Sequence, residues 1–288
     1  DRVETNATRA TDDFGSNMLQ VPANTLYTAH YTGTVTAGKR DFNNYSGFLR
    51  FKKNYGHMSS AYISLSRNER TPDATELFNA KTSMTNMSGA KYRLRHVGNP
   101  NLDSEVHTTF ELGFENMFMG SHINGSIYYN DVSDYITTYR VSDGTYDNTV
   151  NDARVYKNVD ATIWGYELTA RKNITSNVKT TLNLNYTHGD DDTQNRPLPQ
   201  IMPLSGDISL EYQTGSVNYG IRANFADTQD NFDSRVLDTG RTGGYTVYDI
   251  YAGVEPTPNI RFSMGVSNLT DKRYATHLNS TNSIDSTA

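Results

Sequence analysis

The amino-acid sequence predicts an all-β protein, an antiparallel transmembrane β-barrel. Polar and apolar residues alternate along about eleven segments, which is the pattern of strands with two different faces. These segments are joined by connections of two kinds, short turns and long polar loops. In an antiparallel wall, this arrangement puts the short turns at one rim and the long loops at the other, as in bacterial membrane barrels.

The positions of these connections define the expected strands in order. Each short connection holds Gly, Asn or Pro, which suit tight turns; they are 53–56, 116–121, 172–176, 213–216 and 255–259. The long polar connections lie near 10–41, 69–104, 141–152, 189–205, 229–242 and 271–288. The strands expected between them are 1–9, 42–53, 57–68, 105–115, 122–140, 153–171, 177–188, 206–213, 217–228, 243–254 and 260–270.

A period of two supports the strand assignment most clearly in five segments. Apolar and polar residues take alternate positions in 110–114, 164–170, 178–186, 217–225 and 260–266. A soluble sandwich would show the same alternation. Strands of ten or more residues with long loops on one side only favour the membrane barrel.

The composition supports a wall with one lipid face and one wet face. Only 35% of the residues are hydrophobic, yet the chain has 20 Tyr and 11 Phe. Disordered chains are equally polar but poor in aromatic residues. No apolar run approaches the ~18 residues that a membrane helix needs. Tyr suits the boundary between lipid and water, because its ring is apolar and its hydroxyl is polar.

Several functions are disfavoured. The chain has no Cys, which excludes structural disulfides and thiolate metal sites. Its net charge is −6 and it has no long basic run, so we expect no nucleic-acid partner. It lacks a nucleophile elbow, a Gly-rich phosphate loop and an HExxH motif. We therefore expect neither an enzyme nor a covalently bound cofactor.

Six segments stand out in order along the chain: SRNERTPDATELF at 66–78, GNPNLDSE at 98–105, FELGF at 110–114, IYYNDVSDYI at 127–136, YKNVDATIWGYEL at 156–168 and VSNLTDKRY at 266–274. In this order and register, they resemble the barrel motifs of TonB-dependent outer-membrane receptors. The resemblance covers nearly the whole chain.

This resemblance implies that residues 1–288 are the C-terminal part of a receptor barrel, about eleven strands of a 22-strand barrel. The N-terminal plug, the early strands and the last strand are expected to be absent. It implies the bacterial cell outer membrane as location, with outer-membrane lipid around the wall. It also implies active transport of a scarce metal or metal complex, driven by the TonB complex through the missing plug.

A narrower resemblance points to the cargo. RTPDATE at 70–76, YATHLN at 274–279 and SGFLRF at 46–51 look like the copper-receptor branch of the family. Copper is therefore the first expected cargo. The alternatives are a ferric-siderophore receptor and, from another class, a non-transporting surface barrel or passive porin.

Candidate cargo residues follow from each alternative. Thioether and imidazole groups suit soft copper, and the most site-like group is Met84, Met87 and His96 in a long connection. A ferric siderophore would need aromatic and Arg-lined loops. The candidates for that role are Tyr92, Arg93, Arg95, Arg235 and Arg241.

Other residues have expected structural roles. Arg70 and Glu105, at strand ends, are expected to form ion pairs within the wall or to the plug. Gly165 is interpreted as a device for packing or barrel curvature, and the neighbouring Trp164 is expected to face lipid. The acidic run at 190–192 could bind calcium through its oxygens, but the favoured interpretation is a solvated loop.

Overall fold

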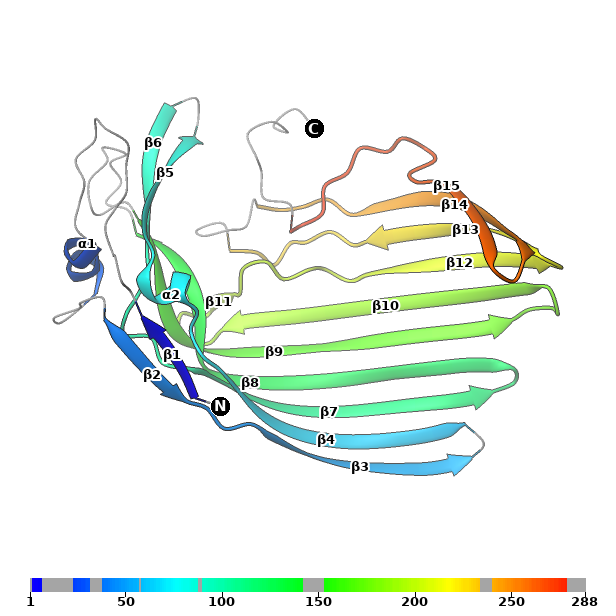
Figure 1. Cartoon of the computed structure of the whole chain (residues 1–288), viewed down its shortest axis with the longest axis horizontal. Helices are drawn as coiled ribbons and strands as arrows, with labels where there is room; N and C mark the ends of the chain where they lie inside the picture. Colours follow the sequence, from blue (N-terminus) through cyan, green and yellow to red (C-terminus); the bar gives the residue numbers. More distant parts are fainter. Residues whose placement is uncertain are drawn as a thin grey trace.

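The structure, a computed structural model, describes residues 2–6, 23–31, 38–56, 58–87, 90–141, 153–233 and 240–278. Its main feature is a curved, open, antiparallel sheet in which ten strands follow one another as neighbours (Figure 1). They are β3 (Gly47–Gly56), β4 (Ser59–Arg70), β7 (Glu105–Phe118), β8 (Ser121–Val141), β9 (Ala153–Asn173), β10 (Val178–Asp191), β12 (Ser205–Thr214), β13 (Val217–Ala226), β14 (Tyr245–Thr257) and β15 (Ile260–Val266). We call this sheet the wall.

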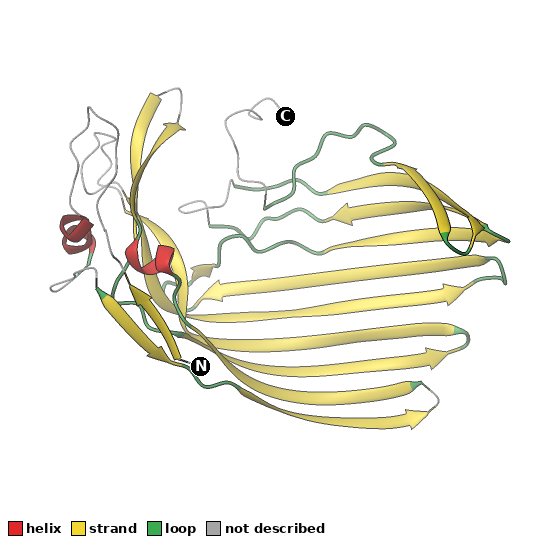
Figure 2. Ribbon diagram, in the orientation of Figure 1, coloured by secondary structure: helices red, strands yellow, loops and turns green. Residues whose placement is uncertain are grey.

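The remaining described elements lie at one end of the wall (Figure 2). They are β1 (Arg2–Asn6), α1 (Ala23–His30), β2 (Lys39–Asn43), α2 (Ala74–Phe78), β5 (Ala80–Met87), β6 (Ala90–Val97) and β11 (Arg196–Pro197). Among the described residues, no helix is long and apolar enough to cross a membrane.

The two predicted rims are confirmed. All five predicted short connections join neighbouring strands of the wall, and Figure 1 shows them together at one end. Left-handed backbone at Met119, Gly120 and Gly215 allows two of these turns to be tight. We call this end the short-turn rim and the opposite end the long-loop rim.

The prediction was wrong for the first strand and for the content of two loops. Within 1–9, β1 pairs with β2 in a separate two-stranded sheet, so it is not a wall strand. The connection near 69–104 contains α2 and the β5–β6 hairpin, and the connection near 10–41 contains α1. Polar composition hid α1 and α2, because these helices bury their few apolar residues against distant parts of the chain.

The outward face of the wall carries an apolar band. One row of cross-strand partners runs over β4, β7, β8 and β9, and each of its side chains is at least 41% exposed. The row consists of Leu65, Phe110, Tyr129 and Trp164. The next row, towards the short-turn rim, is Ile63, Leu112, Ile127 and Tyr166. In water, such a contiguous exposed band would be an aggregation hazard. It matches the lipid face of a membrane barrel, and Trp164 lies on it as predicted.

The concave face is polar and repeats one packing motif. Tyr62 lies directly opposite Gly113, Tyr128 opposite Gly165, and Tyr251 opposite Gly220. Each tyrosine ring occupies the space that a Cβ atom on its glycine would need. Glycines in strands help a sheet to curve, and an aromatic residue laid over a glycine on the neighbouring strand helps to fix the register. The predicted packing role of Gly165 therefore has a physical basis in Tyr128.

The long-loop rim carries a lobe with its own apolar core. Beyond a bulge at Asp134, which has left-handed backbone, β8 and β9 continue together past the wall. One cluster on this extension includes Leu26 and Tyr27 of α1 and Val97 of β6. A second cluster includes Leu77 of α2, with Phe42, Leu102 and Ile136. We call α1, α2, β2, β5, β6, residues 98–104 and this extension the outer lobe.

Candidate functional site

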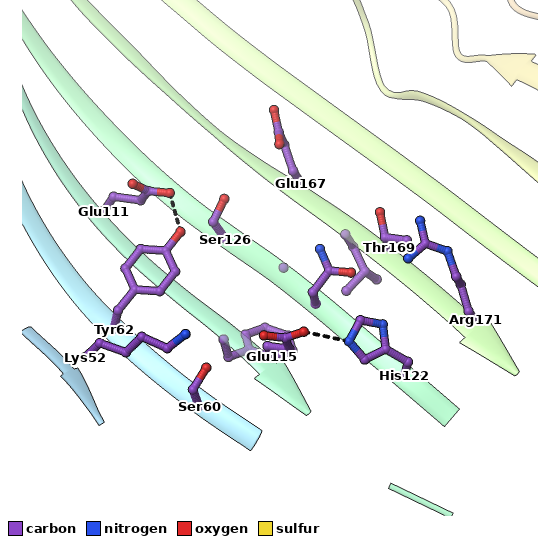
Figure 3. A pocket seen from close by; sticks show the side chains of 14 residues that line it. Lys52, Ser60, Tyr62, Glu111, Glu115, His122, Ser126, Glu167, Thr169 and Arg171 are labelled. Atoms are coloured by element: carbon purple, nitrogen blue, oxygen red, sulfur yellow. Dashed lines mark hydrogen bonds and ion pairs between the residues drawn. The ribbon is translucent and has the colours of Figure 1, made fainter. Parts of the chain in front are cut away.

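The concave face is hollowed near the short-turn rim by a pocket of about 460 Å³ (Figure 3). Side chains from β3, β4, β7, β8 and β9 line it, so five consecutive strands must be in register to form it. The charged members and their nearest polar neighbours are Lys52, Tyr62, Glu111, Glu115, His122, Glu167 and Arg171. We call this the lumen pocket.

Part of the lumen pocket is held by hydrogen bonds within the wall. The Tyr62 hydroxyl donates to Oε1 of Glu111 over 2.6 Å, and the Arg50 guanidinium lies 4.5 Å from the centre of the Tyr62 ring. Nε2 of His122 lies 2.8 Å from Oε1 of Glu115. These contacts orient two of the three carboxylates.

The third carboxylate is different. The Glu167 carboxylate makes no hydrogen bond or ion pair with any side chain that the structure describes, although it shares the pocket with two other glutamates. The same holds for Lys52 and Arg171 at the pocket's edges. The lumen pocket therefore presents an acidic and two basic side chains to the interior of the barrel. Its geometry suits the binding of a polar surface.

A second functional region is the junction between the wall and the outer lobe. Arg70 donates from Nε and from one terminal nitrogen to the two oxygens of Glu105, at 2.7 Å each. It also donates two hydrogen bonds of 3.0 Å to Glu76 in α2. Glu76 in turn completes a capping box with Asp73, which starts the helix. Arg70 and Glu105 were expected to form ion pairs within the wall or to the plug, and the structure shows that they pair with each other.

Glu105 is strongly stabilised as an anion. It lies at the long-loop end of β7, five residue pairs beyond the Leu65–Phe110 pair of the apolar band, and is only 3% exposed. Burial by itself raises its pKa, but hydrogen bonds from Arg70, His107 and the Ile136 N–H outweigh this and lower the pKa of Glu105 to about 2. The carboxylate therefore remains charged at any physiological pH.

The segment 98–105 docks onto α2 and completes the junction. The Asn99 N–H donates to the Glu76 carbonyl over 2.7 Å, and Leu102 is buried against Leu77. Gly98 approaches the backbone of α2 so closely that a Cβ atom would clash. These contacts explain why Gly, Asn, Leu and Glu occur at this spacing.

Asn158, in the motif at 156–168, connects this motif to the same junction. Its side chain accepts from the Asp103 N–H over 2.9 Å and donates to the Asp103 carbonyl over 3.1 Å. The motifs at 66–78, 98–105 and 156–168 thus meet in space. Their residues anchor the outer lobe on the wall, and none of these contacts forms a catalytic arrangement.

The near-terminal motif builds a separate turn. The Asn268 side chain accepts from the Lys272 N–H over 3.0 Å and donates to the Lys272 carbonyl over 2.9 Å. The Asn268 N–H donates to Asp249 over 2.9 Å, which ties the turn to β14. Tyr274 packs on Tyr245, with ring centres 4.3 Å apart.

The copper candidates lie in the β5–β6 hairpin, but the strand register does not bring all three together. Met84 pairs with Arg93, Met87 with Ala90, and His96 with Lys81. Six residue steps separate the Met87 and His96 positions, about 20 Å at the usual rise of a strand. Among the described residues, no group of three His, Cys, Asp or Glu could hold a metal ion. Copper binding by these residues stays a prediction.

The siderophore candidates are divided between two places. Tyr92, Arg93 and Arg95 occupy β6, whereas Arg241 lies beyond β13 and pairs with Asp230 over 2.5 Å. The Arg241 side chain is 65% exposed. Arg235 falls outside the described residues.

The acidic run at 190–192 is engaged by neighbouring side chains. Asp190 pairs with His188 over 2.8 Å, and Asp192 accepts from Thr162 over 2.8 Å. Asp191 is buried and pairs with Arg196 over 3.0 Å. The favoured interpretation of a solvated loop was therefore wrong for Asp191, because the chain folds back at Arg196 and covers it.

Sequence reasoning missed two groups of residues. One is the lumen pocket, whose only sequence signal was the polar face of alternating strands. The other is a buried cluster in which Asp191 also accepts from Tyr139, and Arg196 pairs with Asp233 over 2.6 Å. Its members come from three separate segments, so no local motif could reveal it.

Comparisons with known proteins give a consistent result. The family described as "TonB dependent receptor-like, beta-barrel" matches residues 6–269. The structure of the copper transporter OprC is similar with a TM-score of 0.76 and 25% identity, covering 97% of this chain and 40% of that chain. The siderophore receptor PirA from Pseudomonas aeruginosa is similar with a TM-score of 0.60 and 20% identity, covering 82% and 40%.

A ferric enterobactin receptor, a PfeA mutant from Pseudomonas aeruginosa, gives a TM-score of 0.61 and 18% identity, covering 83% of this chain and 36% of that chain. At such identities, the likeness to the two siderophore receptors shows the fold alone. This chain spans about 40% of the length of these structures or less.

Proposed function

The chain belongs to the TonB-dependent receptor family, as part of its β-barrel, and on that premise we propose that it forms part of an active transporter in the bacterial outer membrane. The proposed cargo is a scarce metal or metal complex, with copper first. One observation carries the proposal: the wall has an exposed apolar band outside and a hollowed polar face inside. No covalent chemistry is part of this function.

The lumen pocket supports a plug as the occupant of the barrel. Glu167 has no partner within the described chain, and Glu111 and Glu115 lie beside it. A plug that presents cationic side chains here would neutralise this group in a partly desolvated place, where charge pairs are stronger than in bulk water. We place that plug outside residues 1–288, and the TonB complex would act on it.

Copper is favoured as cargo by one comparison and by the chemistry of the hairpin. The copper transporter structure matches 97% of this chain, against 82–83% for the siderophore receptors. Met84 and Met87 would supply thioether ligands, and His96 an imidazole. Because the register separates them, we propose that the two methionines and His96 contact copper at different points along the hairpin.

A ferric siderophore remains the second candidate. Arg241 is an exposed cation at the long-loop rim, and β6 carries Tyr92, Arg93 and Arg95. Arginine and aromatic side chains suit a large anionic chelate. A passive porin or a surface barrel without transport is disfavoured, because the family match covers residues 6–269.

The test uses the full-length protein in cells that lack other copper and siderophore receptors. We expect copper uptake that requires TonB and that falls when Met84 and Met87 are both changed to Leu, or when His96 is changed to Ala. Met264→Leu is the matched control, because Met264 is 74% exposed on the outward face of β15.

Three outcomes would count against parts of this proposal. Uptake of a ferric siderophore without uptake of copper would replace the cargo. Normal copper uptake by both hairpin variants would remove these ligands. Copper entry that is independent of TonB would remove active transport.

A further inference from the structure

A second cavity, of about 260 Å³, opens beside β10 at the long-loop rim. It exists because β10 and β12 pair only up to Asn185 and Ser205, whereas β10 continues to Asp191. The end of β10 pairs instead with β11, at Asp190 and Asp191. Between these two pairings, Ile201, Pro203 and Leu204 lie beside residues 186–188, and Pro203 has no N–H to donate to this part of the β10 edge. The gap between β10, this segment and residues 227–231 forms the cavity.

The walls of this cavity are held in place by a buried side chain. Gln229 is 7% exposed, and its Nε2 donates to the Ile201 carbonyl over 2.6 Å. Its Oε1 accepts from the Asn231 N–H over 3.1 Å. The backbone of Gln229 also exchanges two hydrogen bonds with Thr242. The two loops that bound the cavity are therefore fixed relative to each other.

The cavity has an apolar side and a polar side. Ile201, Pro203 and Leu204 supply the apolar side, and Asp227 and Asn231 contribute to the polar side. No Lys or Arg is among its lining residues, which disfavours a phosphate. Within the part of the chain that the structure describes, no three His, Cys, Asp or Glu side chains are placed to hold a metal ion.

The aromatic residues nearby do not form a cage for a quaternary ammonium. Tyr186 lines the cavity, but its ring stacks on Tyr166 at 5.5 Å and meets Trp164 edge-on at 5.4 Å. One face of the Tyr186 ring is therefore covered by Tyr166. A small neutral group with several hydroxyls and an apolar face fits what remains: hydroxyls towards Asp227 and Asn231, and C–H groups towards Pro203 and Leu204.

We propose that this cavity binds one sugar residue of a saccharide, which is a role separate from cargo uptake. The sugar could belong to the headgroup of a glycolipid or to a free oligosaccharide. The cavity adjoins Trp164 and Tyr186, which belong to the outward face at the long-loop end of the apolar band. A headgroup at the membrane surface would lie at this level.

Trp164 is the only tryptophan in this chain and provides the readout. Its ring lies 5.4 Å from both Tyr186 and His188, and both of these line the cavity. The emission of Trp164 in the full-length protein is obtained as the difference between the wild type and a Trp164→Phe variant. One probe is free N-acetylglucosamine. The other is phosphatidylcholine vesicles with or without monogalactosyl diacylglycerol.

We expect a saturable change in Trp164 emission with at least one saccharide probe. Asp227→Ala should weaken the apparent affinity at least tenfold, and Leu204→Trp, which fills the cavity, should abolish binding as detected by calorimetry. Asp131→Ala is the matched control, because Asp131 is an exposed carboxylate on β8 outside the cavity.

Binding of the free sugar supports a soluble saccharide as the source, and a response only to glycolipid vesicles supports a headgroup. The proposal is overturned if neither saccharide probe changes the Trp164 emission, if binding persists unchanged by calorimetry in both cavity variants, or if choline alone reproduces the emission change. Copper uptake is measured separately, so its failure would leave this result unaffected.

Discussion

Arg70 and Glu105 connect the end of β4 to the start of β7 through two hydrogen bonds of 2.7 Å. The same guanidinium reaches Glu76 in α2, so a single side chain links two wall strands to the outer lobe. Because Glu105 is 3% exposed, its charge depends on this partner. The motifs that contain Arg70 and Glu105 are therefore the two halves of one anchor.

Removing one side of this anchor should destabilise the outer lobe. In Glu105→Gln the buried charge of the pair is lost, and breaking a buried pair costs about 3–5 kcal/mol. We expect a loss towards the lower end of that range, because the Arg70 side chain is 43% exposed. Protease sensitivity of the segment 98–104 in the full-length protein measures the effect. Glu255→Gln, at an exposed ion pair, is the control and should change nothing.

Acid should have a related effect. The folded-state pKa of Glu105 is about 2, below its ordinary value of 4.5. Its contribution to stability is therefore complete above about pH 4.5 and is lost as the pH falls from there through 2. We expect protease protection of the outer lobe to decline in this window. In Glu105→Gln this part of the pH dependence should disappear; a decline of the same size in that variant would contradict the assignment.

The tyrosine–glycine pairs make a prediction about the wall. Gly113→Ala places a methyl group where the Tyr62 ring lies, and such overpacking costs about 1–3 kcal/mol. Urea unfolding of the purified protein in detergent should show the loss. Gly47→Ala is the control, because a Cβ atom there meets nothing within 4 Å. Adding Tyr62→Ala to Gly113→Ala should recover part of the loss; additive losses would show that the two residues are not coupled.

The two kinds of apolar residue should respond differently to truncation. Leu102 is fully buried in the outer lobe, so Leu102→Ala should cost about 2–5 kcal/mol through lost contacts and a cavity. Leu210 is 48% exposed on the outward face of β12, where lipid can fill the space. Leu210→Ala should therefore cost much less. Equal losses in thermal unfolding would argue against an apolar core in the outer lobe.

The wall could be predicted from the sequence because its signal is local. Alternation along 217–225 and the turn residues at 213–216 both act within a few residues, and both predictions are confirmed by β13 and its turn. The prediction that residues 1–9 form a wall strand was wrong because the signal is only local. A short run can favour a strand without determining its partner strand, and β1 pairs with β2 instead of a wall strand.

The candidate site could be predicted only in part. Ion pairs of Arg70 and Glu105 were predicted from their places at strand ends, but their pairing with each other comes from the structure. The lumen pocket was not, because Glu111 and Glu167 meet there only through the register of β7, β8 and β9. Strand register likewise places Met87 and His96 far apart in the β5–β6 hairpin, although only nine positions in the sequence separate them.

The sequence by itself determined the alternating strands, the two unlike rims and the motifs of the family, because each of these depends on residues that are close together in the sequence. Tertiary structure alone decided the tyrosine–glycine pairs, the buried cluster of Asp191 and Arg196, and the apolar core of the outer lobe. The physical reason is that strand register and the packing of distant segments depend on contacts between residues far apart in the chain, and local patterns do not specify these.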